Sequence, residues 1–356
     1  MTDRPQRLMD SMKLDKHQGV LVHNPSNMFY LSGYTGEGMV LLANGLSAII
    51  TDFRYTEQAE KQAPGFLVEM TDKDASHEAI VNRLCKAHGL DTLYYEDDYL
   101  TVRAFEDCKA AAPGMAWKSL GMEVQKQREV KDASELELMA KACQITGEAF
   151  EHVLGEIHEG LTEKEIALTL DFYMLRHGAD GLAFSTIVAA GANGSLPHAV
   201  PGGYKLQKGD MITMDFGAKY GRYCADMTRT VALGNPSEEM RRVYDTVFIA
   251  QQRAQDAVAA GKNCREIDSI ARDYIDRQGY QGRFGHGLGH SLGVDIHENP
   301  RFNTVCNVVL KENMVMTVEP GVYLPGIGGV RIENSVVVTK DGCVPLTKPS
   351  RELIIL

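Results

Sequence analysis

The sequence lacks the features that mark several protein classes. It has 356 residues, with only 12 prolines and one tryptophan. It has no uninterrupted run of about 18 apolar residues that would span a membrane, and no block of five or more Lys and Arg residues. Its formal net charge is −11, from 37 basic and 48 acidic residues. We therefore expect a globular protein that binds neither nucleic acid nor membrane.

Cysteine is also scarce. The seven cysteines are dispersed, odd in number and without a CxxC pair, which argues against a disulfide framework and a zinc ribbon. The N-terminal stretch MTDRPQRLMDSMKLDKH has no apolar core of a secretory signal. These observations predict free thiols and a cytoplasmic location.

The chain length favours two domains. Up to about residue 125, a polar helix near 3–14 and the apolar runs GVLVHN, MVLLA, SAIIT and TLYYE predict a mixed α/β unit. The charged stretch KQREVKDASELELMAKA then leads into a helix that Asp132 or Ser134 caps. We expect domains at 1–125 and 126–356.

The second domain contains a weak internal repeat. Six residues of GLTEKEIALTLDFYMLRHG recur 101 positions later in GKNCREIDSIARDYIDRQG: Gly160, Glu165, Ile166, Tyr173, Arg176 and Gly178 correspond to Gly261, Glu266, Ile267, Tyr274, Arg277 and Gly279. A domain of two αβ halves related by a pseudo-twofold axis would explain the repeat. Chance similarity between amphipathic helices is the alternative.

Two aspartates lie eleven positions apart in MDFGAKYGRYCADMTRT. If this stretch is a hairpin that turns at Tyr220 and Gly221, Asp215 lies opposite Asp226 on one face of the sheet. Directly opposed like charges repel, so the pairing predicts a cation between the two carboxylates.

Two kinds of cation can neutralise such a pair. In a surface hairpin, Arg222 or Arg229 would be enough. The apolar flanks ITM and TVAL instead indicate a core strand, where an unneutralised carboxylate is very costly. The second interpretation predicts a metal ion.

Histidines cluster in RFGHGLGHSLGVDIHENP, at His286, His290 and His297. The interspersed glycines disfavour a helix, and the spacing does not fit a dinucleotide-binding loop. On an extended strand, His286 and His290 share a face. A single buried histidine is usually a hydrogen-bonded core residue, but three within twelve positions favour a site.

Two further carboxylates lie in apolar strand-like runs of MVMTVEPGVYLPGIGGVRIENSVVVT. Glu319 can simply end a strand at Pro320, and Glu333 can pair with Arg331. Together with the two aspartates and a histidine, however, they make an oxygen-rich donor set that suits Mn²⁺ or another hard divalent ion. Four carboxylates are excessive for one ion, so we expect two ions about 3.5 to 4 Å apart in a hydrolytic site.

These motifs resemble those of a known family. MDFGA, ADMTRT, PHA, GHGLGHSLGVDIHE, TVEPGVY and VRIEN are similar to the Xaa-Pro aminopeptidase and prolidase family of pita-bread metallopeptidases, and NPSNMFYLSGYTG and TDFRYTEQA resemble its creatinase-like N-terminal domain. The resemblance implies an α/β (α+β) fold: a pita-bread catalytic domain of two pseudo-twofold αβ halves, preceded by a smaller creatinase-like α/β domain.

The resemblance also implies roles for residues. Asp215 would bind one ion, Asp226 and Glu333 would bridge both, and His290 and Glu319 would complete the other. Glu319 would also shuttle a proton to the leaving proline nitrogen, and His297 would stabilise the oxyanion, with His198 positioning the substrate. Substrate-side residues would be His286, Tyr323 and Arg331.

Several points stay open at this stage. The implied cofactors are two divalent ions, with Mn²⁺ expected and Co²⁺, Fe²⁺ or Zn²⁺ as alternatives. The implied substrate is a proline-containing peptide or dipeptide, and the implied assembly is a homodimer. The sequence does not distinguish a dipeptidase from an aminopeptidase P, nor does it identify the residue preferred before proline or the pathway.

Other functions on related folds are disfavoured. A metal-free peptide- or protein-binding module, like the histone-chaperone subunits with this fold, would not need the five ligand residues. Methionine aminopeptidase normally lacks the first domain, and creatinase replaces ligand carboxylates. A mononuclear iron oxygenase would need two histidines and one carboxylate.

Overall fold

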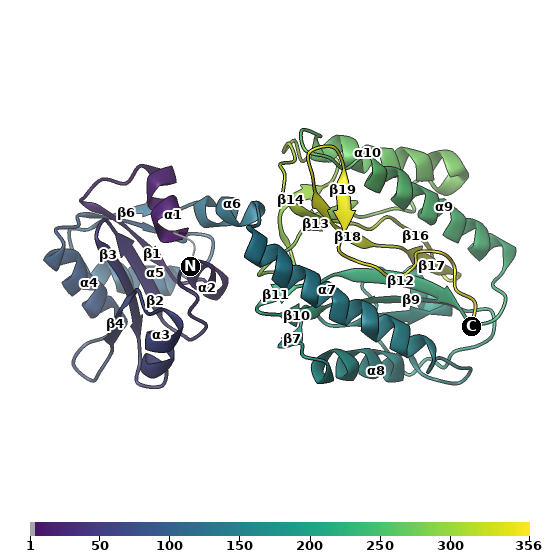
Figure 1. Ribbon diagram of the computed structural model, residues 1–356, viewed down its shortest axis with the longest axis horizontal. Helices are drawn as coiled ribbons and strands as arrows, with labels where there is room; N and C mark the ends of the chain where they lie inside the picture. Colours follow the sequence, from purple (N-terminus) through teal and green to yellow (C-terminus); the bar gives the residue numbers. More distant parts are fainter. Residues whose placement is uncertain (1–3) are drawn as a thin grey trace. The chain divides into compact units, whose positions relative to one another are not determined.

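The computed structural model describes residues 4–356 and divides into two compact units, one ending at Arg128 and the other comprising Glu129–Leu356 (Figure 1). None of the helices within residues 4–356 is long and apolar enough to cross a membrane.

The N-terminal unit is a six-stranded mixed sheet covered by helices. The strand order is β4-β3-β2-β1-β5-β6, with β1 antiparallel to β2 and parallel to β5. Its strands are β1 (Gln18–Val22), β2 (Met39–Ala43), β3 (Leu46–Thr51), β4 (Leu67–Met70), β5 (Thr92–Tyr95) and β6 (Ala116–Ser119). Its helices are α1 (Arg4–Met12), α2 (Pro25–Ser32), α3 (Thr56–Gln62), α4 (His77–Ala87), α5 (Val102–Ala111) and α6 (Glu123–Glu129).

Alternation along the strands explains the layers of this unit. Val20 and Val22 of β1 pack in an apolar cluster with α1, α2 and α3, whereas Leu21 packs on the opposite face against α4. Successive side chains of a strand point to opposite faces, so a continuous apolar run indicates a sheet covered on both sides. The predicted mixed α/β unit is confirmed; the predicted helix near 3–14 is α1, and residue 3 lies outside the described residues.

The second unit begins with a long helix whose start the sequence predicts. Asp132 accepts a hydrogen bond from the backbone N–H of Glu135, and the Glu135 side chain accepts one from the backbone N–H of Asp132. This reciprocal capping box satisfies N–H groups that have no partner within the helix. Of the two predicted caps, Asp132 is therefore the one that the structure uses.

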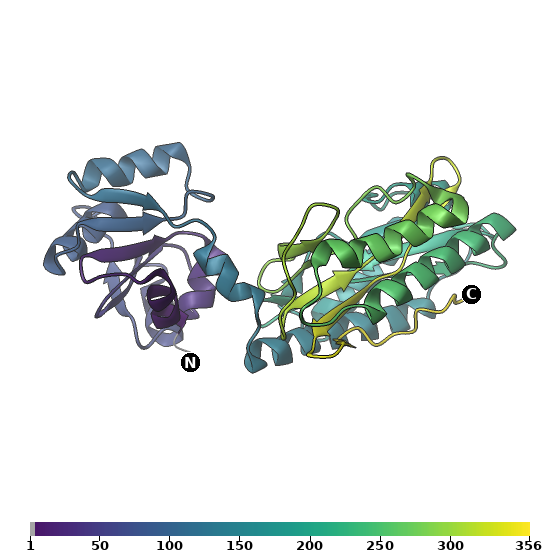
Figure 2. The ribbon, with the colours of Figure 1, turned by 90° about the horizontal axis from the view of Figure 1, so that it is seen from above.

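The second unit consists of helices packed against several small sheets (Figures 1 and 2). The two main sheets have the orders β12-β9-β8 and β14-β13-β15-β18-β19; β11-β10-β7 and β16-β17 complete the set. The helices are α7 (Ala133–Leu154), α8 (Glu163–Arg176), η1 (Gly191–Ser195), α9 (Glu238–Asp256), α10 (Cys264–Ile275) and η2 (Asp276–Tyr280). The strands are β7 (Gly181–Leu182), β8 (Ile187–Ala190), β9 (Met211–Phe216), β10 (Ala218–Tyr220), β11 (Tyr223–Cys224), β12 (Met227–Ala232), β13 (Gly289–Ser291), β14 (Glu298–Phe302), β15 (Val315–Val318), β16 (Gly321–Leu324), β17 (Gly328–Arg331), β18 (Asn334–Val338) and β19 (Cys343–Pro345).

Two halves of this unit repeat one arrangement. Helices α7 and α8 pack on the β8, β9 and β12 sheet, whereas α9 and α10 pack mainly on strands β15 to β18. The chain before α8 and the chain before α10 make the same backbone hydrogen bonds: Gly160 N–H donates to Leu206 O, and Gly261 N–H donates to Leu310 O, each over 2.9 Å. This correspondence, in the positions of the repeat, supports the predicted duplication.

The register of the aspartate hairpin differs from the prediction. The turn lies at Gly221 and Arg222, with φ of 56° and 75°, and Asp215 pairs with Thr228 rather than with Asp226. Two consecutive residues with positive φ match the twist of a two-residue hairpin turn. The predicted register is therefore wrong by two residues. Because side chains alternate with a period of two, the slip leaves both aspartates on the same face.

The histidine segment also differs from its expected extended form. Between His286 and His297 only Gly289–Ser291 forms a strand, so His286 and His290 do not lie on one continuous strand. Glycines at 287 and 289 approach the backbone of Phe302 and Thr317 so closely that a Cβ at either position would clash. The segment is shaped by these close approaches rather than by regular pairing.

Candidate metal-binding active site

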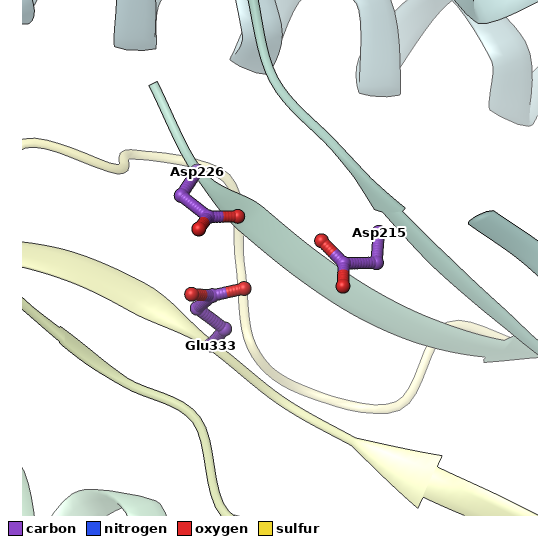
Figure 3. A group of neighbouring side chains, drawn as sticks. All are labelled: Asp215, Asp226 and Glu333. Atoms are coloured by element: carbon purple, nitrogen blue, oxygen red, sulfur yellow. The ribbon is translucent and has the colours of Figure 1, made fainter. Parts of the chain in front are cut away.

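Three carboxylates from distant segments meet in the second unit. Asp215 is on β9, Asp226 directly precedes β12, and Glu333 directly precedes β18; one oxygen of each lies within 4.8 Å of the others. Figure 3 shows the three carboxylates pointing toward one another. Their exposed fractions are 9%, 5% and 1% respectively. The structure therefore gathers three like charges out of water.

Such a cluster requires protons or cations. Burial, followed by the charges of the neighbouring carboxylates, raises the pKa of Asp226 and of Glu333 well above their usual values. Thr228 donates a 2.7 Å hydrogen bond to Glu333 Oε2. Asp215 Oδ1 and Glu333 Oε1 are buried and have no hydrogen-bond donor within residues 4–356. A buried carboxylate oxygen that accepts no hydrogen bond still needs a positive partner. Hard divalent ions bind such oxygens.

His290 extends the cluster. Its Nε2 lies 3.6 Å from Asp226 Oδ2 and 3.4 Å from Glu319 Oε1. Its Nδ1 donates to the backbone carbonyl of Ser291 over 3.0 Å, an assignment that leaves a lone pair on Nε2. Burial lowers the pKa of His290 to about 4. A neutral imidazole facing two carboxylates is the geometry of a metal ligand oriented by a backbone carbonyl.

Glu319 approaches the same ring nitrogen of His290 as Asp226 does. Thr317 donates a 3.0 Å hydrogen bond to Glu319 Oε1, and burial raises the pKa of Glu319 to about 7. A carboxyl group with this pKa is able to accept and release a proton near neutral pH. The structure therefore brings together the five predicted ligands, and their donor set fits divalent ions.

The cation that neutralises Asp215 is not one that we expected. Arg331 donates to Asp215 Oδ2 over 2.6 Å and is itself 3% exposed. Arg229 instead donates to the backbone carbonyls of Ser350 and Pro349. All residues of β9 and β12 are buried, so the surface-hairpin interpretation is wrong.

A second hydrogen-bonded group lies beside the carboxylates. Arg331 donates to the hydroxyl of Tyr323 over 2.9 Å, and this hydroxyl lies 2.8 Å from His286 Nε2. His286 Nδ1 lies 2.8 Å from the backbone carbonyl of Gly287, so Nδ1 carries the proton and Tyr323 donates to Nε2. Burial lowers the pKa of His286 to about 4. Tyr323, which is itself hydrogen bonded to His286, therefore holds the guanidinium of Arg331 in place against Asp215.

The site opens into a cavity of about 530 Å³. Four of the five predicted ligands line it, whereas Glu333 lies behind them and is 1% exposed. His198 and His297 line the same cavity, and the ring of His297 packs edge-on against His290 with centroids 4.6 Å apart. The predicted catalytic histidines thus lie beside the predicted metal ligands.

Two comparisons identify the family. Residues 137–340 match metallopeptidase family M24, and residues 4–130 match the creatinase/prolidase N-terminal domain. The chain belongs to metallopeptidase family M24. The predicted family resemblance, the pita-bread fold and the preceding creatinase-like domain are confirmed.

Relatives of this M24 metallopeptidase carry two kinds of name. It is 35% identical to the Xaa-Pro dipeptidase of Pyrococcus furiosus, over 99% of this chain and 100% of the relative. It superimposes on the Xaa-Pro dipeptidase from Bacillus anthracis with a TM-score of 0.95 and 39% identity, over 99% of both chains. It also superimposes on the X-Pro aminopeptidase from Thermotoga maritima MSB8 with a TM-score of 0.92 and 36% identity, over 99% and 100% of the two chains.

Sequence reasoning missed several residues of this M24 site. Thr228 and Thr317 hydrogen bond to Glu333 and Glu319. Thr317 is two positions from Glu319, and this spacing on a strand was a usable signal. Arg301 of β14 lies opposite His290 and lines the cavity. No local pattern distinguishes Arg301 from any other exposed strand cation.

Proposed function

We propose that this M24 metallopeptidase hydrolyses the peptide bond that precedes proline, either in Xaa-Pro dipeptides or at the free N-terminus of longer peptides. The observation that carries the proposal is the buried set of four carboxylates and one neutral imidazole at the base of a cavity. Relatives named for each activity align over nearly the whole chain. A metal-free binding module has no need for this costly set of buried charges.

We further propose two divalent ions, with Mn²⁺ as the native metal and Co²⁺, Fe²⁺ or Zn²⁺ as alternatives. Asp215 would serve one ion, His290 and Glu319 the other, and Asp226 and Glu333 both. The position of Asp226 supports sharing, because it is close to Asp215 and Glu333 as well as to His290. Bound ions would polarise the scissile carbonyl and lower the pKa of a water nucleophile.

The protein's own residues would move protons and orient the substrate. Glu319, which lies 3.4 Å from His290 on the cavity wall, would transfer a proton to the leaving proline nitrogen. Burial lowers the pKa of His297, so a neutral imidazole would donate to the scissile carbonyl oxygen. His198 would help to position the peptide at the cavity wall.

The remaining predicted residues would act on the substrate side. His286, Tyr323 and Arg331 form a connected chain beside Asp215. Phe184 and Ile187 add apolar wall to the cavity. A tertiary amide with a rigid ring and no N–H fits general peptidases poorly, and an apolar wall next to the metal ligands suits that ring.

Location, assembly and domain limits stay predictions. All seven thiols are free, which suits the reducing cytoplasm. The homodimer rests on the family resemblance, and light scattering during gel filtration would test it. We propose that residues 1–125 form the creatinase-like domain and residues 126–356 the catalytic domain, a division that limited proteolysis would test.

The decisive experiment compares two substrates. The protein is stripped of metal, reloaded with Mn²⁺ or Co²⁺, and assayed with a neutral Xaa-Pro dipeptide and the matched Xaa-Pro-Xaa tripeptide. An N-acetylated dipeptide serves as the control for the free N-terminus. Cleavage of the dipeptide alone identifies a dipeptidase, and efficient cleavage of the tripeptide identifies an aminopeptidase P. No cleavage of either substrate with either metal overturns the proposal.

A further inference from the structure

A buried lysine lies behind the histidines of the site. The side chain of Lys131 is 1% exposed and forms an ion pair with Glu298, whose side chain is 7% exposed, over 3.2 Å. Its Nζ also donates to Ser291 Oγ over 3.1 Å and to the backbone carbonyl of Glu129 over 3.5 Å. An ammonium group has three protons, and these three acceptors use all of them.

Lys131 is itself fixed to the sheet that carries His290. Its backbone N–H donates to Asn313 O over 3.0 Å, and the preceding residue, Val130, pairs with Met314. The ammonium is therefore held from the backbone side as well as by its acceptors. A lysine anchored in this way is a rigid support, in contrast to a surface lysine with a free side chain.

Both side-chain partners of Lys131 are next to a histidine of the site. The carbonyl of Ser291, whose hydroxyl accepts from Lys131, accepts the proton of His290 Nδ1. Glu298 follows His297 directly in the sequence. Its Oε1 accepts from the backbone N–H of Asp295 over 3.1 Å, so the loop between the two histidines is tied to the same carboxylate.

The local backbone has been shaped around this ion pair. Pairing between β13 and β14 shifts register after His290, so that Ser291 lies opposite Glu298. A Cβ on Gly293 would lie 2.8 Å from Glu298 Oε1, so a larger residue at this position would displace the carboxylate from its present place. The carboxylate of Glu298 thus lies inside an irregular loop. Regular strand pairing does not fix the backbone of this loop.

We propose that Lys131 is a positioning residue for the reaction, acting through Ser291 on His290 and through Glu298 on His297. The inference rests on the proposed function, because these two histidines are its metal ligand and its carbonyl donor. Residues that orient a metal-ligating histidine commonly change metal affinity or activity by about 10- to 100-fold when they are removed. A purely structural ion pair would change stability alone.

The test separates positioning from stability by removing one or both charges. The variants are Lys131→Met, Glu298→Gln and the double variant Lys131→Met/Glu298→Met. Lys61→Met is the control, because Lys61 is an exposed lysine on α3 with a 72% exposed side chain. For each variant we would measure thermal stability, the Mn²⁺ dissociation constant by calorimetry, the visible spectrum of the Co²⁺-loaded protein, and kcat and KM for an Xaa-Pro dipeptide.

Positioning predicts a specific pattern. The single variants lose about 10- to 100-fold in kcat and in Mn²⁺ affinity, and their Co²⁺ spectra change because the imidazole ligand has moved. KM changes by less than about threefold, because the rest of the cavity lining is unchanged and the lost stabilisation falls mainly on the transition state. The double variant, with no unpaired buried charge, regains thermal stability but keeps the losses in kcat and Mn²⁺ affinity.

The opposite result would overturn the inference. If the double variant has the kcat, Mn²⁺ affinity and Co²⁺ spectrum of the parent protein, the pair contributes stability and no positioning. Should Lys131→Met fail to fold, Glu298→Gln and the double variant decide the question in the same way. If the parent protein cleaves no Xaa-Pro substrate, the proposed function fails, while the Mn²⁺ affinity and Co²⁺ spectrum still test positioning.

Discussion

Arg331 and Asp215 form a buried ion pair at the edge of the carboxylate cluster, with Nη2 and Oδ2 2.6 Å apart. The guanidinium neutralises one of the clustered carboxylates, and Tyr323 and Thr228 hold it in place. Within residues 4–356 the ion pair of Asp215 is with Arg331, while burial raises the pKa of Asp226, Glu333 and Glu319. This distribution leads to the first prediction.

Replacing Arg331 by Met should destabilise the metal-free protein more than the metal-loaded protein. Removing one partner of a buried pair leaves an uncompensated charge and costs about 3 to 5 kcal/mol, whereas a bound ion supplies replacement charge for Asp215. Urea unfolding followed by far-UV circular dichroism, with and without Mn²⁺, measures the difference. Arg54→Met removes an exposed arginine from its pairs with Asp52 and Glu37 and should change nothing measurable. Equal losses with and without Mn²⁺ would contradict the prediction.

Replacing Asp226 by Ala should remove at least one bound ion per chain and lower kcat by more than about 100-fold, because a ligand matters more than the groups that orient it. The fold should persist, since the substitution removes one of several mutually repelling carboxylates. Metal analysis after dialysis and circular dichroism measure the two effects. Asp245→Ala, on the exposed face of α9, is the matched control. Full metal content together with full activity would refute the two-ion assignment.

Metal affinity should rise with pH through the neutral range. In the metal-free protein, burial raises the pKa of Glu319 to about 7 and that of Asp226 and Glu333 well above their usual values. Below these pKa values the carboxyl groups hold protons that an ion must displace. The Mn²⁺ dissociation constant should therefore be larger at pH 6 than at pH 8, by up to about tenfold per pH unit for each proton that the ion displaces. Calorimetry in buffers of different ionisation enthalpy counts the protons, and an affinity independent of pH would show the prediction to be wrong.

The N-terminal unit should lose stability on mild acidification because of His23. Burial lowers the pKa of His23 to about 4, and both ring nitrogens are buried without a hydrogen-bond partner within residues 4–356. Unfolded chains take up this proton below about pH 6.5, whereas the folded unit does so only near pH 4, so stability present above pH 6.5 is lost as pH falls. The loss attributable to His23 is about 3 kcal/mol at pH 4.

The single tryptophan, Trp117 of β6, reports on this unit. Urea unfolding curves followed by its fluorescence should shift between pH 7 and pH 4.5, and His23→Phe should reduce the shift. His88→Phe, at an exposed histidine that follows α4, should leave the shift as it is. An unchanged shift in His23→Phe would assign the acid sensitivity to other groups.

Arg301 should contribute to binding of the free proline carboxylate. Arg301 lines the cavity, pairs with His290 across strands β13 and β14, and is exposed. Its guanidinium is therefore available to an anionic substrate group. A hydrogen bond to a charged group contributes about 1.5 to 3 kcal/mol, so Arg301→Met should raise KM for an Xaa-Pro dipeptide by about 10- to 100-fold. The corresponding Xaa-Pro amide has no carboxylate and should show little change. Equal increases for both substrates would mean that Arg301 acts on something other than this charge.

Local patterns predicted much of the fold. Apolar runs predicted four of the six strands of the N-terminal sheet, β1, β2, β3 and β5, but not β4 and β6. The predicted cap at Asp132 marked the start of α7. These features depend on the backbone preferences and hydrogen bonds of residues that are only a few positions apart in the sequence. The positions of the hairpin strands were also predictable, but not their register, because Arg222 adopts a positive φ that the residue type does not reveal.

The sequence by itself determined the family, because the four carboxylates and His290 stand in motifs that resemble those of the metallopeptidases it matches. Only the tertiary structure decided what surrounds them. Arg331 reaches Asp215 across 116 positions, and Lys131 reaches Ser291 across 160. Such contacts depend on how the strands of the two halves pack against each other, and this packing is a property of the whole buried core rather than of any segment.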